Sequence, residues 1–155
     1  MHMREEAARI LRAMRNLPDF AESDLSDVNA CGVDGDNALH VAVLWDDLQG
    51  AEALIDAGVD INEAGDLGYT PLHVACMRGS MEMVRLLVAN GADLFALSEG
   101  APPFAAARLA GRDDVCDLLK PLMEQVQSQD PKTWARARIA RLRREIASLE
   151  HSLES

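Results

Sequence analysis

The chain reads Asn37-Ala38-Leu39-His40-Val41-Ala42, and 33 residues later it reads Thr70-Pro71-Leu72-His73-Val74-Ala75. A second stretch repeats at the same spacing, since Asp27-Val28-Asn29 returns as Asp60-Ile61-Asn62. Self-similarity at a fixed period of this length indicates one supersecondary unit that is used again and stacked on its neighbours. We therefore expect an array of similar units in place of a single globular core.

The second copy follows the pattern T-P-L-H-x-A, and on this motif and its period the chain resembles the ankyrin-repeat family. The resemblance implies an all-α solenoid of stacked helix-turn-helix units with short hairpin fingers, followed here by a C-terminal helix. It also implies that His40 and His73 bond backbone groups at the repeat junctions, and it argues against metal or acid–base chemistry for them.

Single residues in each copy predict where helices begin and end. Thr70 suits the cap of a helix start, and Leu72 lies on the face that is predicted to pack inward. Gly58 and Gly91 are expected to end the second helix of their units, and Gly79 is expected to separate the two helices of its unit. All three glycines are predicted to adopt the left-handed conformation that glycine tolerates best.

A degraded third copy runs from Gly100 to Ala107, with one residue removed from the loop and Ala105 at the histidine position. Beyond it, residues 113 to about 128 read as a helix that bends or restarts at Pro121. The expected organisation is an N-terminal cap helix and linker at 1–30, ankyrin repeats at 31–128 (about 31–63, 64–96 and 97–128) and a basic amphipathic helix at 129–155.

Charge is unevenly distributed along the chain, whose formal net charge is −11. Residues 17–130 contain 21 acidic and 5 basic residues, whereas residues 131–155 contain 6 basic and 3 acidic residues. An acidic body repels phosphate backbones, so the composition argues against nucleic acid as the main ligand. It favours a protein partner with a basic surface; the alternative is that the acidity serves solubility alone.

Metal, cofactor and catalytic sites are not predicted. Cys31, Cys76 and Cys116 fall in separate repeats without a CxxC or His/Cys cluster, which leaves metal binding without support and favours reduced thiols. No phosphate-binding loop or nucleophile motif occurs, so we expect a protein that is not an enzyme and needs no cofactor. No run resembles a signal peptide or a membrane span, which predicts a cytoplasmic protein without membrane contact.

The ankyrin resemblance implies that partners lie against the fingers and the exposed side of each first helix, which together form a concave surface. Carried onto this sequence, that surface comprises Val33, Asp34, Asp36, Leu44, Trp45, Asp66, Leu67, Tyr69, Met77, Arg78, Ser98, Glu99, Ala101 and Leu109. Its centre is predicted to hold Trp45, Tyr69, Met77 and Arg78, flanked by Leu44 and Leu67. Trp, Tyr and Arg dominate interface energies. The acidic rim is predicted to consist of Asp34, Asp36, Asp66 and Glu99. The alternative is that the Trp45 and Tyr69 rings fold back over their own repeats.

The C-terminal segment has a different pattern. Asp130-Pro131 is a helix-start signal, and the apolar residues that follow alternate by four and three, as in a heptad seam. This seam comprises Ala135, Ile139, Leu142, Ile146, Leu149 and Leu153. In a parallel dimer Arg138 would face Arg143, whereas an antiparallel pair would set Arg143 against Glu150. Three fates stay open: packing on the last repeat, self-association as a homodimer, or docking on another protein.

The sequence therefore predicts a protein-protein interaction module that binds a partner through its concave face. It would act as a small adaptor or as a stoichiometric inhibitor, for example of the antitoxin or immunity type. The alternative is a structural or scaffold protein that self-associates through the C-terminal heptad helix.

Overall fold

The computed structural model describes residues 2–129 and 131–154, which form helices, turns and isolated β-bridges at Cys31–Asn37 and Ser98–Ala101. The all-α class is confirmed. The chain divides into two compact units, Met1–Asp117 and Leu118–Ser155. The helical elements in chain order are α1 (His2–Met14), η1 (Pro18–Phe20), α2 (Ala38–Leu44), α3 (Leu48–Asp56), η2 (Asp66–Gly68), α4 (Pro71–Arg78), α5 (Met81–Ala89), α6 (Pro103–Leu109), α7 (Asp113–Gln129) and α8 (Pro131–Glu154).

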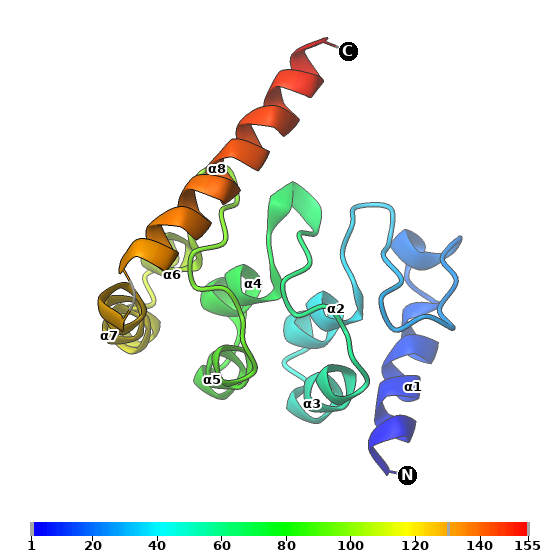
Figure 1. The fold of residues 1–155 in the computed structure, drawn as a ribbon. Coiled ribbons are helices and arrows are strands. Elements are labelled where there is room, and N and C mark those ends of the chain that lie inside the picture. Colours follow the sequence, from blue (N-terminus) through cyan, green and yellow to red (C-terminus); the bar gives the residue numbers. More distant parts are fainter. Residues whose placement is uncertain (1, 130, 155) are drawn as a thin grey trace. The chain divides into compact units, whose positions relative to one another are not determined.

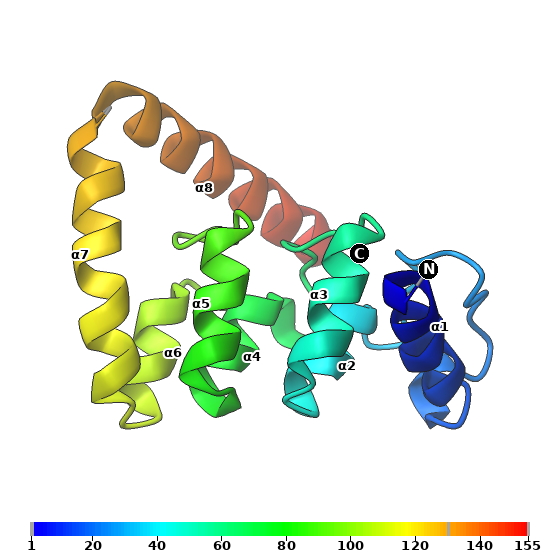
Figure 2. The same cartoon turned by 90° about the horizontal axis from the view of Figure 1, so that it is seen from below.

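The first unit is built from helix pairs stacked side by side. Helix α2 packs on α3 and α4 packs on α5, while α4 also contacts α2 on one side and α6 on the other. Figure 1 shows α3 and α5 in one row and α2 and α4 in a second row, with the hairpin fingers projecting beyond the second row. Figure 2 shows the same two rows from below. This arrangement is the stacked helix-turn-helix solenoid that the repeat predicts.

The core between these rows consists of aliphatic residues at repeated positions. Leu39 and Leu72 in the first helices are fully buried, and so are Leu54 and Leu87 in the second helices. The inward packing predicted for Leu72 is confirmed. Because these leucines recur at the same place in each unit, every unit buries its apolar face on its neighbours, as the solenoid architecture requires.

A pair of asparagines joins successive units by the same hydrogen bonds. The Asn29 side chain accepts from Asp60 N at 2.6 Å and donates to Gly58 O at 3.4 Å. One period later, the Asn62 side chain accepts from Asp93 N at 2.7 Å and donates to Gly91 O at 3.3 Å. The sequence repeat thus becomes a repeated bond, since Asn29 and Asn62 each satisfy backbone groups just after a second helix.

The glycine predictions are confirmed at two positions and wrong at the third. Gly58 and Gly91 are left-handed, with φ of 91° and 92°. Gly79 is extended instead, with φ −77° and ψ 166°. A Cβ atom at Gly79 would lie 3.0 Å from the Ala75 Cα and 3.1 Å from the Ala75 oxygen, so glycine is needed there for space beside α4. Only the neighbouring repeats take up the left-handed turn, at Asp46 (φ 53°) and Gly111 (φ 72°).

The N-terminal helix runs His2–Met14, within the region where the sequence predicts a cap helix and linker. Ile10 and Met14 are fully buried, and α1 contacts both α2 and α3. The Arg9 guanidinium donates to the Asp47 carboxylate, which caps α3 by accepting from Gly50 N at 2.9 Å. Helix α1 thereby covers the first repeat, as a terminal capping element must.

The last two helices, α7 and α8, contain the two proline signals of the C-terminal sequence, Pro121 and Pro131. Helix α7 runs continuously from Asp113 to Gln129 with Pro121 inside it, so it does not restart there; a bend, the other possibility that the sequence left open, stays a prediction. Proline removes one backbone donor, and the helix continues because its other turns keep their bonds. Helix α8 begins at Pro131, and the capping residue predicted for it, Asp130, lies outside the described residues.

Candidate functional site

The second and third fingers end in tight two-residue turns. In the third finger, Ser98 and Ala101 exchange two backbone hydrogen bonds of 2.9 Å across Glu99-Gly100. Both loop residues have positive φ, 49° at Glu99 and 81° at Gly100, which is the backbone twist that two-residue hairpins favour. Leu67 and Gly68 adopt the same conformation in the second finger, with φ of 54° and 79°. These turns place the side chains of Leu67 and Glu99 at finger tips.

Two buried histidines hold the second and third fingers, each to the first helix of the preceding repeat. His40 Nε2 donates to the Tyr69 carbonyl at 2.7 Å, and its Nδ1 accepts from Asn37 N at 3.1 Å. One unit later, His73 Nε2 donates to the Ala101 carbonyl at 3.0 Å, and its Nδ1 accepts from Thr70 N. Because a carbonyl only accepts, the proton sits on Nε2 in both rings. The structural role predicted for the two histidines is confirmed.

The fingers are also bonded to one another. The Asp36 carboxylate of the first finger accepts from Asp66 N of the second at 2.9 Å. The Ser98 hydroxyl of the third finger donates to the Leu67 carbonyl of the second at 2.7 Å. Neighbouring fingers are therefore fixed in position relative to one another.

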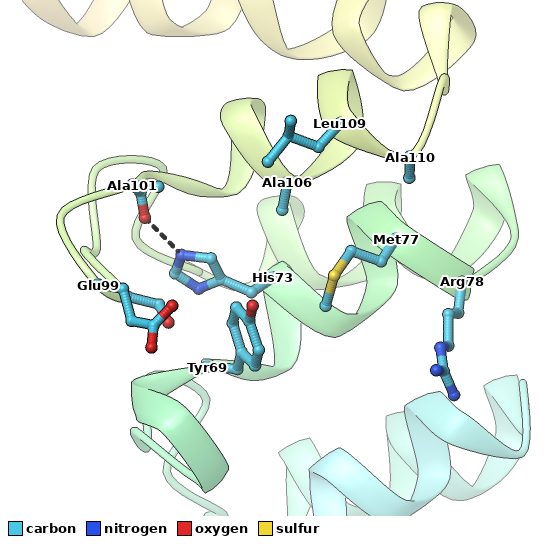
Figure 3. Close-up of a pocket in the computed structure, with 10 residues that line it drawn as sticks. Tyr69, His73, Met77, Arg78, Glu99, Ala101, Ala106, Leu109 and Ala110 are labelled. Atoms are coloured by element: carbon cyan, nitrogen blue, oxygen red, sulfur yellow. Dashed lines mark hydrogen bonds between the residues drawn. The ribbon is translucent and has the colours of Figure 1, made fainter.

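A groove of about 570 Å³ opens between the second and third repeats. Its walls come from two fingers and from the facing sides of α4 and α6 (Figure 3). The lining residues are Tyr69, Ser98, Glu99 and Ala101 from the finger side, His73, Met77 and Arg78 from α4, and Ala106, Leu109 and Ala110 from α6. Its volume falls within the roughly 300–1,000 Å³ of small-molecule binding clefts.

Seven residues of the predicted concave surface line this groove, namely Tyr69, Met77, Arg78, Ser98, Glu99, Ala101 and Leu109. Tyr69 and Met77 are half-buried on its floor, while Arg78 and Glu99 are exposed at its edges. The Tyr69 ring contacts the His73 ring with 5.7 Å between the centroids and an angle of 51° between the planes. Tyr69 is thus held by the histidine that also anchors the third finger.

The other predicted residues lie outside the groove, on the first repeat and on the second finger. Trp45 caps the end of α2 and keeps 45% of its surface exposed, with Leu44 exposed beside it. Leu67 is 59% exposed at its finger tip. Asp36 is half-buried and its carboxylate accepts from Asp66 N, so it bonds the neighbouring finger, and its predicted place in the acidic rim stays a prediction.

The first finger carries a concentration of negative charge. Asp34 is exposed there, and the neighbouring Asp19 carboxylate, together with those of Asp66 and Asp36, raises the pKa of Asp34. Like charges raise the pKa of a carboxyl because they disfavour its ionised form. The first finger therefore carries a negative electrostatic potential.

Comparison with protein families identifies the family to which this architecture belongs. Residues 39–130, more than half of the chain, match the family model described as ankyrin repeats (3 copies). The chain belongs to the ankyrin-repeat family. The fingers and paired helices described above are the parts of these repeats. Ankyrin repeats imply protein-protein interaction, so the chain is a protein-protein interaction module.

Curated ankyrin relatives match shorter stretches. The human and mouse proteins named protein phosphatase 1 regulatory subunit 27 are each 40% identical over 56 residues, which cover 36% of this chain and 36% of theirs. The putative ankyrin repeat protein YahD of Escherichia coli (strain K12) is 31% identical over 68 residues, covering 44% of this chain and 34% of its own. The chain thus spans about a third of the length of each of these relatives.

Three groove residues were missed by the sequence prediction, His73, Ala106 and Ala110. Aligning the repeats would have found the last two, because Ala106 stands at the position of Val74, and Ala110 at that of Arg78 and Trp45. Small side chains at both places leave the space between α4 and α6 unfilled. His73 was assigned only to backbone bonding, although its ring also forms part of the wall.

The remaining reactive groups do not form a chemical site in the part of the chain that the structure describes. There, no group of three or more His, Cys, Asp or Glu side chains is placed to hold a metal ion. All three cysteines are free, and burial raises the pKa of the Cys76 thiol to about 12, which suppresses its thiolate. Among the described helices, none combines the length and the apolar composition that crossing a membrane demands.

Burial of the two histidines makes stability depend on pH. Desolvation lowers the pKa of both His40 and His73 below the ordinary 6.5, although their bonds to the Tyr69 and Ala101 carbonyls oppose the shift. Between the lowered pKa and 6.5, the unfolded chain binds protons that the folded chain rejects, so stability falls as the pH falls. We expect urea denaturation to give a free energy of unfolding that is about 1–2 kcal/mol lower at pH 5.5 than at pH 7.5.

The matched comparison uses His73→Gln, which removes one of the two groups. Its stability should change less between the same two pH values, because glutamine does not titrate. A wild-type stability that is constant or rises on acidification would contradict this assignment.

Proposed function

We propose that this ankyrin protein binds a protein partner in the groove between α4 and α6 and acts as a small adaptor or stoichiometric inhibitor in the cytoplasm. The observation that carries the proposal is the convergence of Tyr69, Met77, Arg78 and Leu109 on one open groove of about 570 Å³. Tyr and Arg are the residue types that most often dominate binding energy, and Met adapts to irregular apolar partners.

The charge of the surrounding surface supports a partner with a basic face. Asp34 and Asp66 are exposed on the fingers, and Glu99 lies at the groove itself. Acidic rims of this kind accelerate the encounter with a basic partner, and the apolar anchors then account for most of the affinity. The names of the two mammalian relatives refer to a regulatory subunit of a phosphatase, which is compatible with regulation by binding.

A tryptophan in place of Ala110 tests the groove directly. Ala110 is exposed at the end of α6, and the first repeat carries Trp45 at the same cap position with a similar backbone, φ −83° against −78°. Ala110→Trp should therefore fold and fill the groove. In affinity capture from a lysate of the source cells, we expect the captured partner to fall at least about tenfold, the loss that about 1.4 kcal/mol of affinity produces.

The control is Ala89→Trp, the same substitution at an exposed alanine that ends α5 on the outer row of helices. Both variants should keep the wild-type melting temperature. Equal capture by wild type, Ala110→Trp and Ala89→Trp would show that the groove is not the docking site.

A second candidate function, self-association, is favoured by the exposed seam of α8. Ile139, Ile146 and Leu149 are exposed on that helix, Leu149 to 60%, together with Leu142 and Leu153. An isolated helix of this length gains stability by burying such a face. The charge order favours an antiparallel pair, in which Ile146 packs against Leu149 and Arg143 lies opposite Glu150 of the second copy.

Sedimentation equilibrium distinguishes this candidate. If the seam pairs two copies, the wild-type chain has the mass of a dimer and Leu149→Glu has the mass of a monomer, because a carboxylate cannot be buried unpaired in the seam. Ala147→Glu, at an exposed position outside the seam, should remain a dimer. A wild-type chain that sediments as a monomer at all concentrations would remove self-association.

A further inference from the structure

We propose that the groove between α4 and α6 binds a peptide segment in one orientation. The segment has one apolar side chain flanked by a basic and an acidic residue. The basic residue would lie toward the third finger, and the acidic residue toward the end of α4. This inference rests on the proposed function, which it deepens by giving the chemistry and orientation of the bound segment.

The middle of the groove is apolar and has room for a partner side chain. Met77 is half-buried there, and Leu109 is 88% exposed on the opposite wall. Ala106 and Ala110 leave space where the second repeat has Val74 and Arg78. Exposed apolar surface beside such a hollow is stabilised when an apolar group covers it, by about 25 cal/mol for each Å² removed from water.

Opposite charges stand at the two ends of this apolar middle. Figure 3 places Glu99 at one end of the groove and Arg78 at the other, with His73 and Met77 between them. Both side chains are exposed, and within the described ranges neither makes a hydrogen bond or an ion pair. Each is therefore available to a partner residue of opposite sign.

Backbone geometry explains why the two charges are kept apart. Glu99 is the first loop residue of a two-residue turn with φ 49°, which holds its side chain at the finger tip. Arg78 is the last residue of α4, at the negative end of the helix dipole. Because the finger is bonded to His73 and α4 is packed between α2 and α6, the separation of the charges is fixed before binding.

A third group offers a polar contact to the bound segment. Within the described chain, the hydroxyl of the half-buried Tyr69 has no hydrogen-bond partner, while its ring is held against His73. A hydroxyl in such a position offers one donor and one acceptor to a bound backbone. A segment that enters in the reverse direction would set its acidic residue against Glu99 and its basic residue against Arg78, and both contacts would be repulsive.

Selection from a phage-displayed library of random 16-residue peptides tests this inference on the full chain. The bait is the wild-type protein or the double variant Glu99→Lys/Arg78→Glu, which exchanges the two charges without changing the apolar middle. We expect wild-type selection to enrich an apolar residue with a basic residue on one side and an acidic residue on the other, in a single order. The double variant should enrich the opposite order.

Synthetic peptides then measure how strongly the groove prefers one charge order over the other. The selected peptide and its charge-exchanged twin should differ at least tenfold in Kd on the wild-type chain, and the preference should reverse on the double variant. Two peptides of equal Kd on both proteins overturn the inference.

The Ala110→Trp variant separates this failure from that of the proposed function. Loss of the selected peptides on Ala110→Trp without any preference for charge order refutes only the inference. Undiminished binding to Ala110→Trp, or no enrichment by any bait, refutes the groove as a docking site as well.

Discussion

Replacing His40 by alanine is expected to lower the free energy of unfolding by about 3 kcal/mol. The imidazole is completely buried, and it bonds Asn37 N through Nδ1 and the Tyr69 carbonyl through Nε2. Alanine would leave the Asn37 amide without that acceptor and would open a cavity at the repeat junction. The Tyr69 carbonyl would keep its bond from Gly65 N at 2.8 Å, so the loss falls mainly on the amide and on packing.

Urea denaturation followed by circular dichroism measures this loss. Gln49→Ala, at an exposed position of α3, is the control and should change stability by no more than about 0.5 kcal/mol. A loss below about 1 kcal/mol for His40→Ala would mean that water or a neighbouring group replaces the histidine, which contradicts the tethering role given to it.

The second large loss of folding stability is expected on replacing Leu72 by alanine. This side chain is fully buried in α4, the helix that contacts α2, α5 and α6. Leu72→Ala removes three carbons from the middle of the stack, and buried leucine truncations of this kind cost about 3–5 kcal/mol. Because each repeat is stabilised by its neighbours, a defect in the central repeat should also make the unfolding of the whole compact unit Met1–Asp117 less cooperative.

Leu67→Ala is the matched control, since the same truncation is made at a finger-tip leucine that is 59% exposed. Its cost should be within about 0.5 kcal/mol. Thermal and chemical denaturation of the two leucine variants side by side measure the difference. Similar losses in both would contradict the assignment of the core to the faces of the paired helices.

Much of this fold could be predicted because repetition encodes it. The copies of Asn29 at Asn62 and of His40 at His73 reappear as copies of the same hydrogen bonds, one period apart. Gly58 and Gly91 adopt the backbone conformation that their position requires. A local rule sufficed in these cases, because each residue bonds or turns within its own unit or with the next.

The prediction failed where neighbouring elements decide the conformation. Gly79 has an extended backbone, and glycine is needed there because a side chain would crowd Ala75. The local turn preference of glycine did not reveal this packing role. Pro121 does not interrupt α7, although local propensity favours a break. In both places the packing or continuity of the helix outweighs the preference of the single residue.

The candidate site could be predicted in outline and not in depth. Family resemblance directed attention to the fingers and first helices, and seven residues of the surface predicted from it line the groove. The hollow itself depends on Ala106 and Ala110, and residues without bulk give little signal in a search for aromatic and charged anchors. Asp36 has a structural role that the sequence did not predict, because its carboxylate also bonds the next finger.

Site-specific photo-crosslinking tests most directly whether the groove is the surface that meets the partner. A benzophenone amino acid would replace Leu109, which is exposed in the groove, and in a second protein Arg85, which is exposed on α5. After irradiation in a lysate of the source cells, we predict that Leu109 becomes attached to a discrete partner protein and that Arg85 does not. Attachment of the partner from Arg85 with none from Leu109 would contradict binding through the groove.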